Sequence, residues 1–436
     1  MSDTLRDDTF AHTIDSFVTV GHDVANPVTS APIDTLQVVF KVAERCNIDC
    51  SYCYYFNMGE SSALGRPPFV NLARTKAIAA WIARGCRELA IPKVLVSFHG
   101  GEPMMLKPAL FDAVCASLRD AITPHASLAF SIQTNGTILS DMWLDLFRAH
   151  VVHVGVSIDG DRPAHDRFRR DKRARSTFNA VSGNLQRLVQ WGESDSRLGP
   201  STISVLDWRN DYKAIYRYLR NLGVRDMSYL LPDRNLDDGF PSASESAHQY
   251  GTALFDIFQA WLTEDDPKVF VRQINNALRH FQLVANGAAS SACTSAAAPG
   301  AGKRIQIVII HSDGTVAVND SFMPALAWYS TLPRHSVESC TLAGFLAELG
   351  STGIDDIPAP AVCRTCRWGG LCRGGDIENR FSRRNGFDNP SLYCEGYKFF
   401  FSHMCELLTR NGYPADLLED RLQQAKPKAW FSGPIA

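Results

Sequence analysis

The chain has 436 residues, of which 45% are hydrophobic and 21% are charged, so it is long enough to form two or three globular domains. Its formal net charge of -2 gives no reason to expect a surface for nucleic acid or for an anionic membrane. The acidic N-terminus lacks a secretory signal and no apolar stretch approaches the roughly 20 residues of a membrane helix, so we expect a cytoplasmic location.

Strand and helix patterns alternate through the first half of the chain. Residues 1–34 show no clear period and predict an extension, and a strong strand pattern follows at 36–43. Five more strand patterns follow, separated by the helices expected at 71–89, 107–121, 140–150, 176–191 and 210–222. Strands that alternate with helices predict an α/β fold with parallel pairing and right-handed crossovers. In such folds, functional groups collect at the C-terminal ends of the strands.

The second half of the chain has a different pattern. Helical patterns fill 244–264 and 267–286, and a run of small residues then predicts a linker. Residues 304–320 predict a hairpin that turns at Asp313 and Gly314, and helical patterns near 395–411 and 415–425 close the chain. We therefore divide the chain into an N-terminal extension (1–34), a barrel (35–235), a helical linker region (236–302) and a C-terminal domain (303–436).

Three cysteines lie close together after the first predicted strand. Cys46, Cys50 and Cys53 are separated by three and then two residues, and Tyr52 precedes the last of them. Three thiolates on one loop can hold three corners of a cubane iron–sulfur cluster and leave its fourth iron open for chemistry. A zinc loop or unrelated buried thiols are the alternatives, but structural zinc takes four ligands and no fourth one lies nearby in the sequence.

This CxxxCxxC motif, with an aromatic residue before its last cysteine, resembles the signature of the radical S-adenosylmethionine (SAM) enzymes. The resemblance implies that a 4Fe-4S cluster at these cysteines binds SAM and cleaves it to methionine and a 5'-deoxyadenosyl radical. It also implies a partial (β/α)6 barrel that is open on one side, and an electron donor of the flavodoxin or ferredoxin type.

Residues at the ends of the next strands extend this resemblance. Gly100, Gly101 and Glu102 belong to a GGEP sequence that by itself also suits a plain turn. In the family this motif receives the methionine amino group of SAM, and polar residues at the later strand ends contact its ribose and carboxylate. The remaining SAM contacts implied by the resemblance are Tyr52, Gln133, Asn135, Ser157, Asp159 and Arg169. The alternative is a hydrogen-bonded strand end for each polar residue and a solvated basic loop for the arginine.

A second group of cysteines lies near the C-terminus. Cys363, Cys366, Cys372 and Cys394 closely resemble part of the auxiliary-cluster extension, called SPASM, of radical SAM enzymes that modify peptides. The resemblance implies that these four residues hold one auxiliary 4Fe-4S cluster. A zinc site with four thiolate ligands is the alternative.

The full SPASM pattern holds two auxiliary clusters, and this chain departs from it. Asn319 stands at the hairpin position of a cysteine, Asp376 replaces the last cysteine of the run, and Cys293 is left without partners. The resemblance therefore implies two clusters in total rather than three. Asp320 follows Asn319 at the place where sulfatase-maturating enzymes carry the Asp that accepts a proton from the substrate, although it also suits a hairpin end.

The segments SVLDW and YLLPDRNLDDG, together with the reduced auxiliary region, resemble radical SAM maturases that build cyclophane rings in ribosomally made precursor peptides. The resemblance implies removal of a β-hydrogen and a carbon–carbon bond to an aromatic side chain. Asp320 and the auxiliary cluster are the hypothetical base and electron acceptor. Two alternatives remain: a sulfatase-maturating enzyme that makes formylglycine, and a non-catalytic iron–sulfur or zinc protein.

Overall fold

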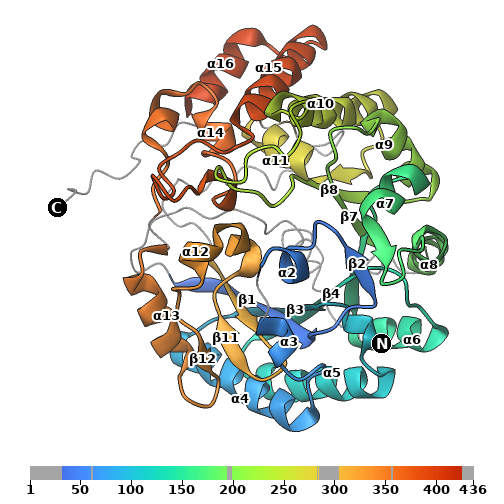
Figure 1. Ribbon diagram of the computed structural model, residues 1–436, viewed down its shortest axis with the longest axis vertical. Helices are drawn as coiled ribbons and strands as arrows, with labels where there is room; N and C mark the ends of the chain where they lie inside the picture. Colours follow the sequence, from blue (N-terminus) through green and yellow to red (C-terminus); the bar gives the residue numbers. More distant parts are fainter. Residues whose placement is uncertain are drawn as a thin grey trace, which may run out of the picture.

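Figure 1 shows a computed structural model of the chain, which describes residues 32–59, 62–193, 199–281, 283, 304–354 and 357–424. Residues 1–31 of the predicted extension, the small-residue linker and Cys293 lie outside the described residues. In the described part of the chain, no helix is both long enough and apolar enough to cross a membrane.

A ten-stranded sheet runs through the described residues in the order β12-β11-β10-β1-β3-β4-β5-β7-β8-β9. Its strands are β1 (Ile33–Ala43), β3 (Lys93–Gly100), β4 (Ser127–Thr134), β5 (Val152–Ser157), β7 (Ser201–Val205), β8 (Asp226–Leu230), β9 (Phe270–Val271), β10 (Arg304–Ile310), β11 (Thr315–Ala317) and β12 (His335–Ser336). Pairing is parallel from β10 to β9 and antiparallel for β11 and β12. The six predicted strands are therefore confirmed as β1, β3, β4, β5, β7 and β8.

Helices cover the outside of this sheet (Figure 1). In the barrel they are α4 (Leu72–Leu89), α5 (Pro108–Ile122), α6 (Asp141–His150), α7 (Arg162–Phe168), α8 (Phe178–Gly192) and α9 (Tyr212–Asn221), with short α2 (Tyr54–Asn57), α3 (Ser62–Gly65) and η1 (Pro103–Met105) near the cysteine loop. After the barrel come α10 (Ala247–Glu264), α11 (Arg272–His280), η3 (Asp320–Ala325), α12 (Leu326–Tyr329), α13 (Leu342–Ser351), η5 (Ala361–Thr365), α14 (Gly369–Cys372), η6 (Glu378–Arg380), α15 (Cys394–Arg410) and α16 (Ala415–Gln424). The N-cap predicted at Asn71 is confirmed, because its side chain accepts a hydrogen bond from the backbone N–H of Arg74.

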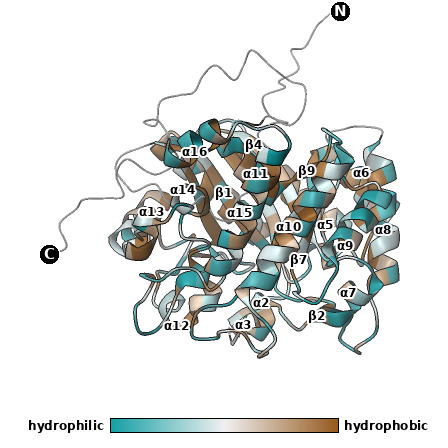
Figure 2. Cartoon of the chain, turned by 90° about the horizontal axis from the view of Figure 1, so that it is seen from above, coloured by the Kyte–Doolittle hydropathy of each residue, from teal (hydrophilic) through white to brown (hydrophobic). Residues whose placement is uncertain are grey.

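The two faces of the barrel sheet differ in polarity. On the outer face, Phe98 packs against Phe130 and against Phe111 of α5, with ring centroids 5.4 and 4.8 Å apart. On the inner face, the side chain of Ser97 accepts hydrogen bonds from Gln37 and Ser131 on the neighbouring strands. Side chains of a strand alternate between its two faces, so the helices cover the apolar face and a polar face lines the barrel. Figure 2 shows hydrophobic strands such as β1 surrounded by helices that contain both hydrophilic and hydrophobic residues.

The C-terminal part of the chain shares the barrel sheet. The predicted hairpin is confirmed as β10 and β11, and Asp313 accepts a hydrogen bond from the backbone of Thr315 at its turn. Strand β10 also pairs with β1 along most of its length, so the sheet crosses the domain boundary predicted at residue 303. Helix α15 packs on α10, where the rings of Tyr250 and Tyr393 lie 5.0 Å apart. The hairpin therefore places the residues that follow it at the mouth of the barrel.

Candidate active site

The three-cysteine loop joins β1 to the short helix α2 and contains β2 (Ile48–Cys50), which pairs with β6 (Arg169–Asp171). Cys53 is the N-cap of α2, and its backbone N–H donates to the carbonyl of Cys50 at 2.9 Å. Asn135 at the end of β4 points its amide toward the sulfur of Cys46, 3.6 Å away. The loop therefore lies at the C-terminal end of the barrel, where the fold predicts a functional site.

The surroundings of this loop fit a 4Fe-4S cluster. Burial raises the pKa of Cys46 to about 12 and that of Cys50 to about 11, so both thiols are neutral until metal replaces their protons. The guanidinium of Arg169 lies close enough to favour the thiolate form of Cys50. Among the described residues, no three His, Cys, Asp or Glu side chains converge as the ligands of one metal ion would. A cubane accommodates this spread because each cysteine binds a different iron atom.

The GGEP segment packs directly on the cysteine loop. The backbone N–H groups of Gly101 and Glu102 donate to the carbonyls of Ala43 and Arg45, at 2.7 and 2.9 Å. Gly100 has φ +130°, and a Cβ atom there would lie 2.0 Å from the carbonyl oxygen of Ala43. These glycines are therefore required for the close approach of two backbone segments, in addition to any contact with a ligand.

The Glu102 side chain is buried beneath this turn. Its carboxylate accepts hydrogen bonds from the backbone N–H groups of Met104 and Asn135 and from the hydroxyl of Thr134, at 2.9, 2.6 and 2.8 Å. Burial raises the pKa of Glu102 to about 7, against the effect of these donors. Glu102 thus ties the end of β3 to the end of β4, and its predicted contact with SAM stays a prediction.

Three hydrogen bonds connect the other polar residues that the sequence predicts near SAM. The Tyr52 hydroxyl donates to Asp159 at 2.7 Å and accepts a hydrogen bond from Arg169 at 2.8 Å. The Gln133 amide donates to the hydroxyl of Ser157 at 2.8 Å. Arg169 is buried rather than part of a solvated loop, which excludes the alternative drawn for it from the sequence. The structure thus joins Asp159 and Arg169 to the three-cysteine loop through Tyr52, and the contacts of these residues with SAM stay predictions.

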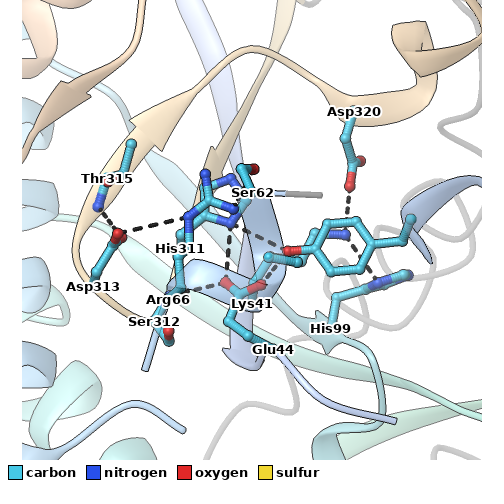
Figure 3. A network of polar contacts seen from close by, with 12 residues as sticks. Lys41, Glu44, Ser62, Arg66, His99, His311, Ser312, Asp313, Thr315 and Asp320 are labelled. Atoms are coloured by element: carbon cyan, nitrogen blue, oxygen red, sulfur yellow. Dashed lines mark hydrogen bonds and ion pairs between the residues drawn. The ribbon is translucent and has the colours of Figure 1, made fainter. Parts of the chain in front are cut away.

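Asp320 is the first residue of η3 and points into the barrel mouth, where it meets Lys41 of β1 (Figure 3). The Lys41 ammonium and the Asp320 carboxylate are 2.5 Å apart, and their side chains are 0% and 7% exposed. Tyr54 of α2 donates to the same carboxylate at 3.2 Å, and the ring nitrogen of His99 lies 3.4 Å from Lys41. Asp320 is therefore part of a buried network rather than a solvated hairpin end.

The protonation states of Asp320 and His99 follow from their surroundings. Burial alone would raise the pKa of Asp320, but Lys41, with smaller contributions from His99 and His311, lowers the pKa below its ordinary value. Burial and the same ammonium lower the pKa of His99 to about 3. Near neutral pH the site therefore contains an ionised carboxylate beside a neutral imidazole.

A second polar network adjoins the first (Figure 3). Glu44 accepts hydrogen bonds from the Tyr55 hydroxyl and from the backbone of Ser312, and its other contact is His311, 3.0 Å away. The sequence motifs did not predict this network, nor the roles of Lys41 and His99. A signal was present, because Lys41, His99 and His311 are single polar residues near the ends of apolar strands.

The second cysteine group lines one small cavity between η5, α14 and α15. Cys363, Cys366, Cys372 and Cys394 all face this cavity, as does Trp368. A zinc ion would draw four sulfurs to about 3.8 Å from one another, since each Zn–S bond is about 2.3 Å. In the described residues no such group converges on one ion, and four thiols that line one cavity fit the four ligands of a 4Fe-4S cluster.

Asn319 and Asp376, which stand where the full pattern has cysteines, interact with other residues of the protein. The Asn319 side chain caps η3 by accepting a hydrogen bond from the backbone of Ser321. Burial lowers the pKa of Arg272, and the nearby carboxylate of Asp376 offsets part of this shift. These roles agree with the prediction of one auxiliary cluster.

Comparison with known proteins relates this barrel to a family and to several relatives. Residues 40–239 match the Radical SAM superfamily. The chain is 27% identical over 386 residues to the Serine-type anaerobic sulfatase-maturating enzyme of Bacteroides thetaiotaomicron, covering 84% of this chain and 88% of the relative. It is 24% identical over 382 residues to the Cysteine-type enzyme of Clostridium novyi, covering 86% and 96%. The barrel region of this chain is therefore similar to the radical SAM superfamily, in agreement with the resemblance of its sequence motifs.

Solved structures share the fold. The structure described as "Native anSMEcpe with bound AdoMet" has a TM-score of 0.69 and 18% identity, covering 86% of this chain and 98% of that one. Streptococcus suis SuiB bound to precursor peptide SuiA has a TM-score of 0.55 and 11% identity, covering 91% and 83%. Both confirm the predicted fold class, the radical SAM barrel.

Proposed function

We propose that this protein is a radical SAM peptide maturase that joins a β-carbon of a precursor peptide to an aromatic side chain, forming a cyclophane. The observation that carries the proposal is the arrangement of the auxiliary region. One complete set of four cysteines faces a single cavity, whereas Asn319 and Asp376 replace cysteines of the other set. This reduced cysteine set is the feature that most resembles the cyclophane-forming maturases.

Two cysteine sets would hold the cofactors. Cys46, Cys50 and Cys53 would bind the SAM-binding cluster, and Cys363, Cys366, Cys372 and Cys394 the auxiliary cluster. When bound, these groups and SAM supply the radical that removes a β-hydrogen and an acceptor for the electron that the ring gives up. The protein supplies the polar barrel mouth that receives the substrate and the base that takes its proton.

The base in this proposal is Asp320. An aromatic ring that has gained a carbon substituent becomes aromatic again when it loses one proton and one electron, so its proton is readily lost and a weak base suffices. Lys41 keeps the Asp320 carboxylate ionised, and Lys41 and Tyr54 hold it in place. The carboxylate is therefore ready to accept a proton before the substrate arrives.

A peptide substrate is supported by the neighbours in structure. Those neighbours include anSMEcpe with a bound Cp18Cys peptide and SuiB with its precursor peptide. For this chain, the probes are synthetic peptides encoded by small reading frames beside its gene. They are incubated with reconstituted enzyme, SAM and dithionite, and the products are analysed by mass spectrometry. We expect a loss of two hydrogens per modified motif and suppressed fragmentation between the joined residues.

Formylglycine formation is the second candidate, favoured by the 27% identity to a serine-type sulfatase-maturating enzyme. Oxidation of serine to formylglycine also removes two hydrogens, so the mass alone does not separate the two reactions. Formylglycine is an aldehyde and reacts with a hydrazide, whereas a carbon–carbon crosslink does not. A hydrazide-reactive product that disappears when serine in the peptide is replaced by alanine would overturn the cyclophane proposal.

A further inference from the structure

The segment at 169–176 forms a basic hairpin, of which all residues except Arg169 have no part in the function proposed so far. It consists of β6, a turn at 172–175 and a bridge between Arg170 and Ser176. Its eight residues include four arginines, one lysine and one aspartate, in a chain whose net charge is -2. Apart from the buried Arg169, all of these cationic residues are exposed. The basic hairpin is thus a compact positive surface on a nearly neutral molecule.

The basic hairpin has a fixed shape, because its only acidic residue, Asp171, forms hydrogen bonds within the turn. The Asp171 carboxylate accepts hydrogen bonds from the backbone N–H groups of Arg173 and Arg175 at 2.8 and 2.9 Å, and from the Arg175 side chain at 2.7 Å. The backbone N–H of Asp171 also donates to the carbonyl of Arg175. In contrast, the side chains of Lys172 and Arg173 have no ion pair or hydrogen bond with any described residue. The tip therefore presents two free cations on an ordered turn.

The basic hairpin is also attached to the three-cysteine loop. Strand β6 pairs with β2, and the pairing places Arg169 opposite Cys50 and Arg170 opposite Asp49. The backbone N–H of Ser51 donates to the carbonyl of Phe168 at 3.3 Å. A molecule docked on the basic hairpin would therefore lie next to the loop that carries Cys50.

We propose that the basic hairpin is the docking site for a small acidic one-electron carrier of the flavodoxin or ferredoxin type. This inference rests on the proposed function, in which the cluster at Cys46, Cys50 and Cys53 must be reduced from outside. In the transfer the reduced carrier loses one electron and the cluster gains it, with no bond made or broken. Opposite charges steer such transient encounters and raise their rate, most strongly at low salt.

The position of the basic hairpin favours a carrier over an acidic segment of the peptide substrate. Strand β2, which pairs with the basic hairpin, lies across the barrel mouth from α12, the helix that follows Asp320 (Figure 1). A carrier docked at the basic hairpin would leave the Lys41 and Asp320 side of the mouth open for substrate. It would also dock beside the cysteine loop rather than beside the base.

The test reverses the two free charges in Lys172→Glu/Arg173→Glu. Its matched control is Lys76→Glu/Arg84→Glu, which makes the same change at exposed positions of α4. The probe is an acidic flavodoxin, and its binding to the reconstituted protein without SAM or peptide is measured by fluorescence anisotropy at low and high salt. The rate of cluster reduction by the reduced flavodoxin is followed by absorbance. We expect both binding and reduction at low salt to weaken about tenfold in the hairpin variant and to change little in the control.

Cleavage of SAM with dithionite is measured in parallel and should be equal in all proteins, because a small reductant needs no docking site. If SAM cleavage falls in the charge-reversal variant, the substitution has disturbed the cysteine loop. The binding and reduction measurements are then repeated on the neutral variant Lys172→Gln/Arg173→Gln, and their result decides whether the hairpin is the docking site. Unchanged flavodoxin binding and reduction would overturn the proposal. A hairpin variant that loses peptide binding but keeps flavodoxin binding would also overturn the proposal. None of these readouts requires a crosslinked product, so failure of the cyclophane proposal would leave the docking result unaffected.

Discussion

Lys41 and Asp320 form an ion pair 2.5 Å long that is almost fully removed from solvent. One partner lies on the first strand of the barrel and the other follows the hairpin that β10 adds to the same sheet. The pair therefore fixes the C-terminal part of the chain against the barrel at the point where we propose that a proton leaves the substrate. Its two charges depend on each other, because either one alone would be buried without compensation.

The first prediction concerns the removal of one charge. Lys41→Met should lower the free energy of unfolding by about 3–5 kcal/mol, because a buried carboxylate is left without its cation. The double variant Lys41→Met/Asp320→Asn should recover more than half of this loss, since it removes the stranded charge. These two variants, the single variant Asp320→Asn and the wild type are compared by urea unfolding of the reconstituted protein.

The pair between Lys93 and Asp34 provides the control for this cycle. Its atoms are 3.7 Å apart and both side chains are 27% exposed, so Lys93→Met should cost less than about 1 kcal/mol. Equal losses in Lys41→Met and in the double variant would contradict the coupling between Lys41 and Asp320.

The second prediction concerns pH. The pKa of Asp320 lies below its ordinary value of 3.8, so the contribution of the ion pair to stability is complete above about pH 3.8 and is lost as the pH falls through the folded pKa. Between about pH 5 and 8 the ratio of crosslinked peptide to 5'-deoxyadenosine should therefore stay constant in the wild type. In Lys41→Met, burial without compensation raises the pKa of Asp320, so this ratio should fall toward the acid end of the range.

Using the ratio removes effects of pH on cluster reduction and on SAM cleavage, because both change numerator and denominator together. Asp320→Asn provides the baseline without a carboxylate. A wild-type ratio that drops to this baseline below about pH 6 would mean that the carboxylate is protonated there, against the expected direction of its pKa shift.

The sequence predicted the parts of the site that local spacing determines. The three-cysteine loop, GGEP and the polar strand ends follow one another along a regular alternation of strands and helices, so their meeting at one end of a barrel follows from the topology. Lys41 was visible as a lone charge in an apolar strand, but its partner Asp320 could not be found from spacing. Their contact depends on the parallel pairing of β10 with β1, which brings together segments far apart in the chain.

The third prediction concerns the auxiliary cavity. Cys372→Ala should reduce the iron content from about eight to about four atoms per chain, because we propose that the four thiols lining the cavity hold one 4Fe-4S cluster. SAM cleavage with dithionite should persist, since Cys46, Cys50 and Cys53 are unchanged, whereas crosslinking should be lost. Cys115→Ala is the control, because that buried thiol packs behind the barrel sheet on α5. Metal analysis that finds about one zinc per chain, with iron unaffected by Cys372→Ala, would show the zinc site instead.

The last prediction compares Gly100, where a Cβ atom would clash with the backbone, with Gly183, where a Cβ atom would meet no neighbour. Gly100 has φ +130°, and a Cβ atom there would lie 2.0 Å from the backbone of Ala43, so Gly100→Ala must push GGEP away from the cysteine loop. We expect Gly100→Ala to lose iron from the SAM-binding site and to lose SAM cleavage, while about four iron atoms remain at the auxiliary site. Gly183 lies inside α8 with nothing within 4 Å of its Cβ position, so Gly183→Ala should keep all iron and raise stability by up to about 1 kcal/mol. Full iron content and SAM cleavage in Gly100→Ala would mean that the loop tolerates the displacement, and that the glycine is not needed for the close packing seen between the two segments.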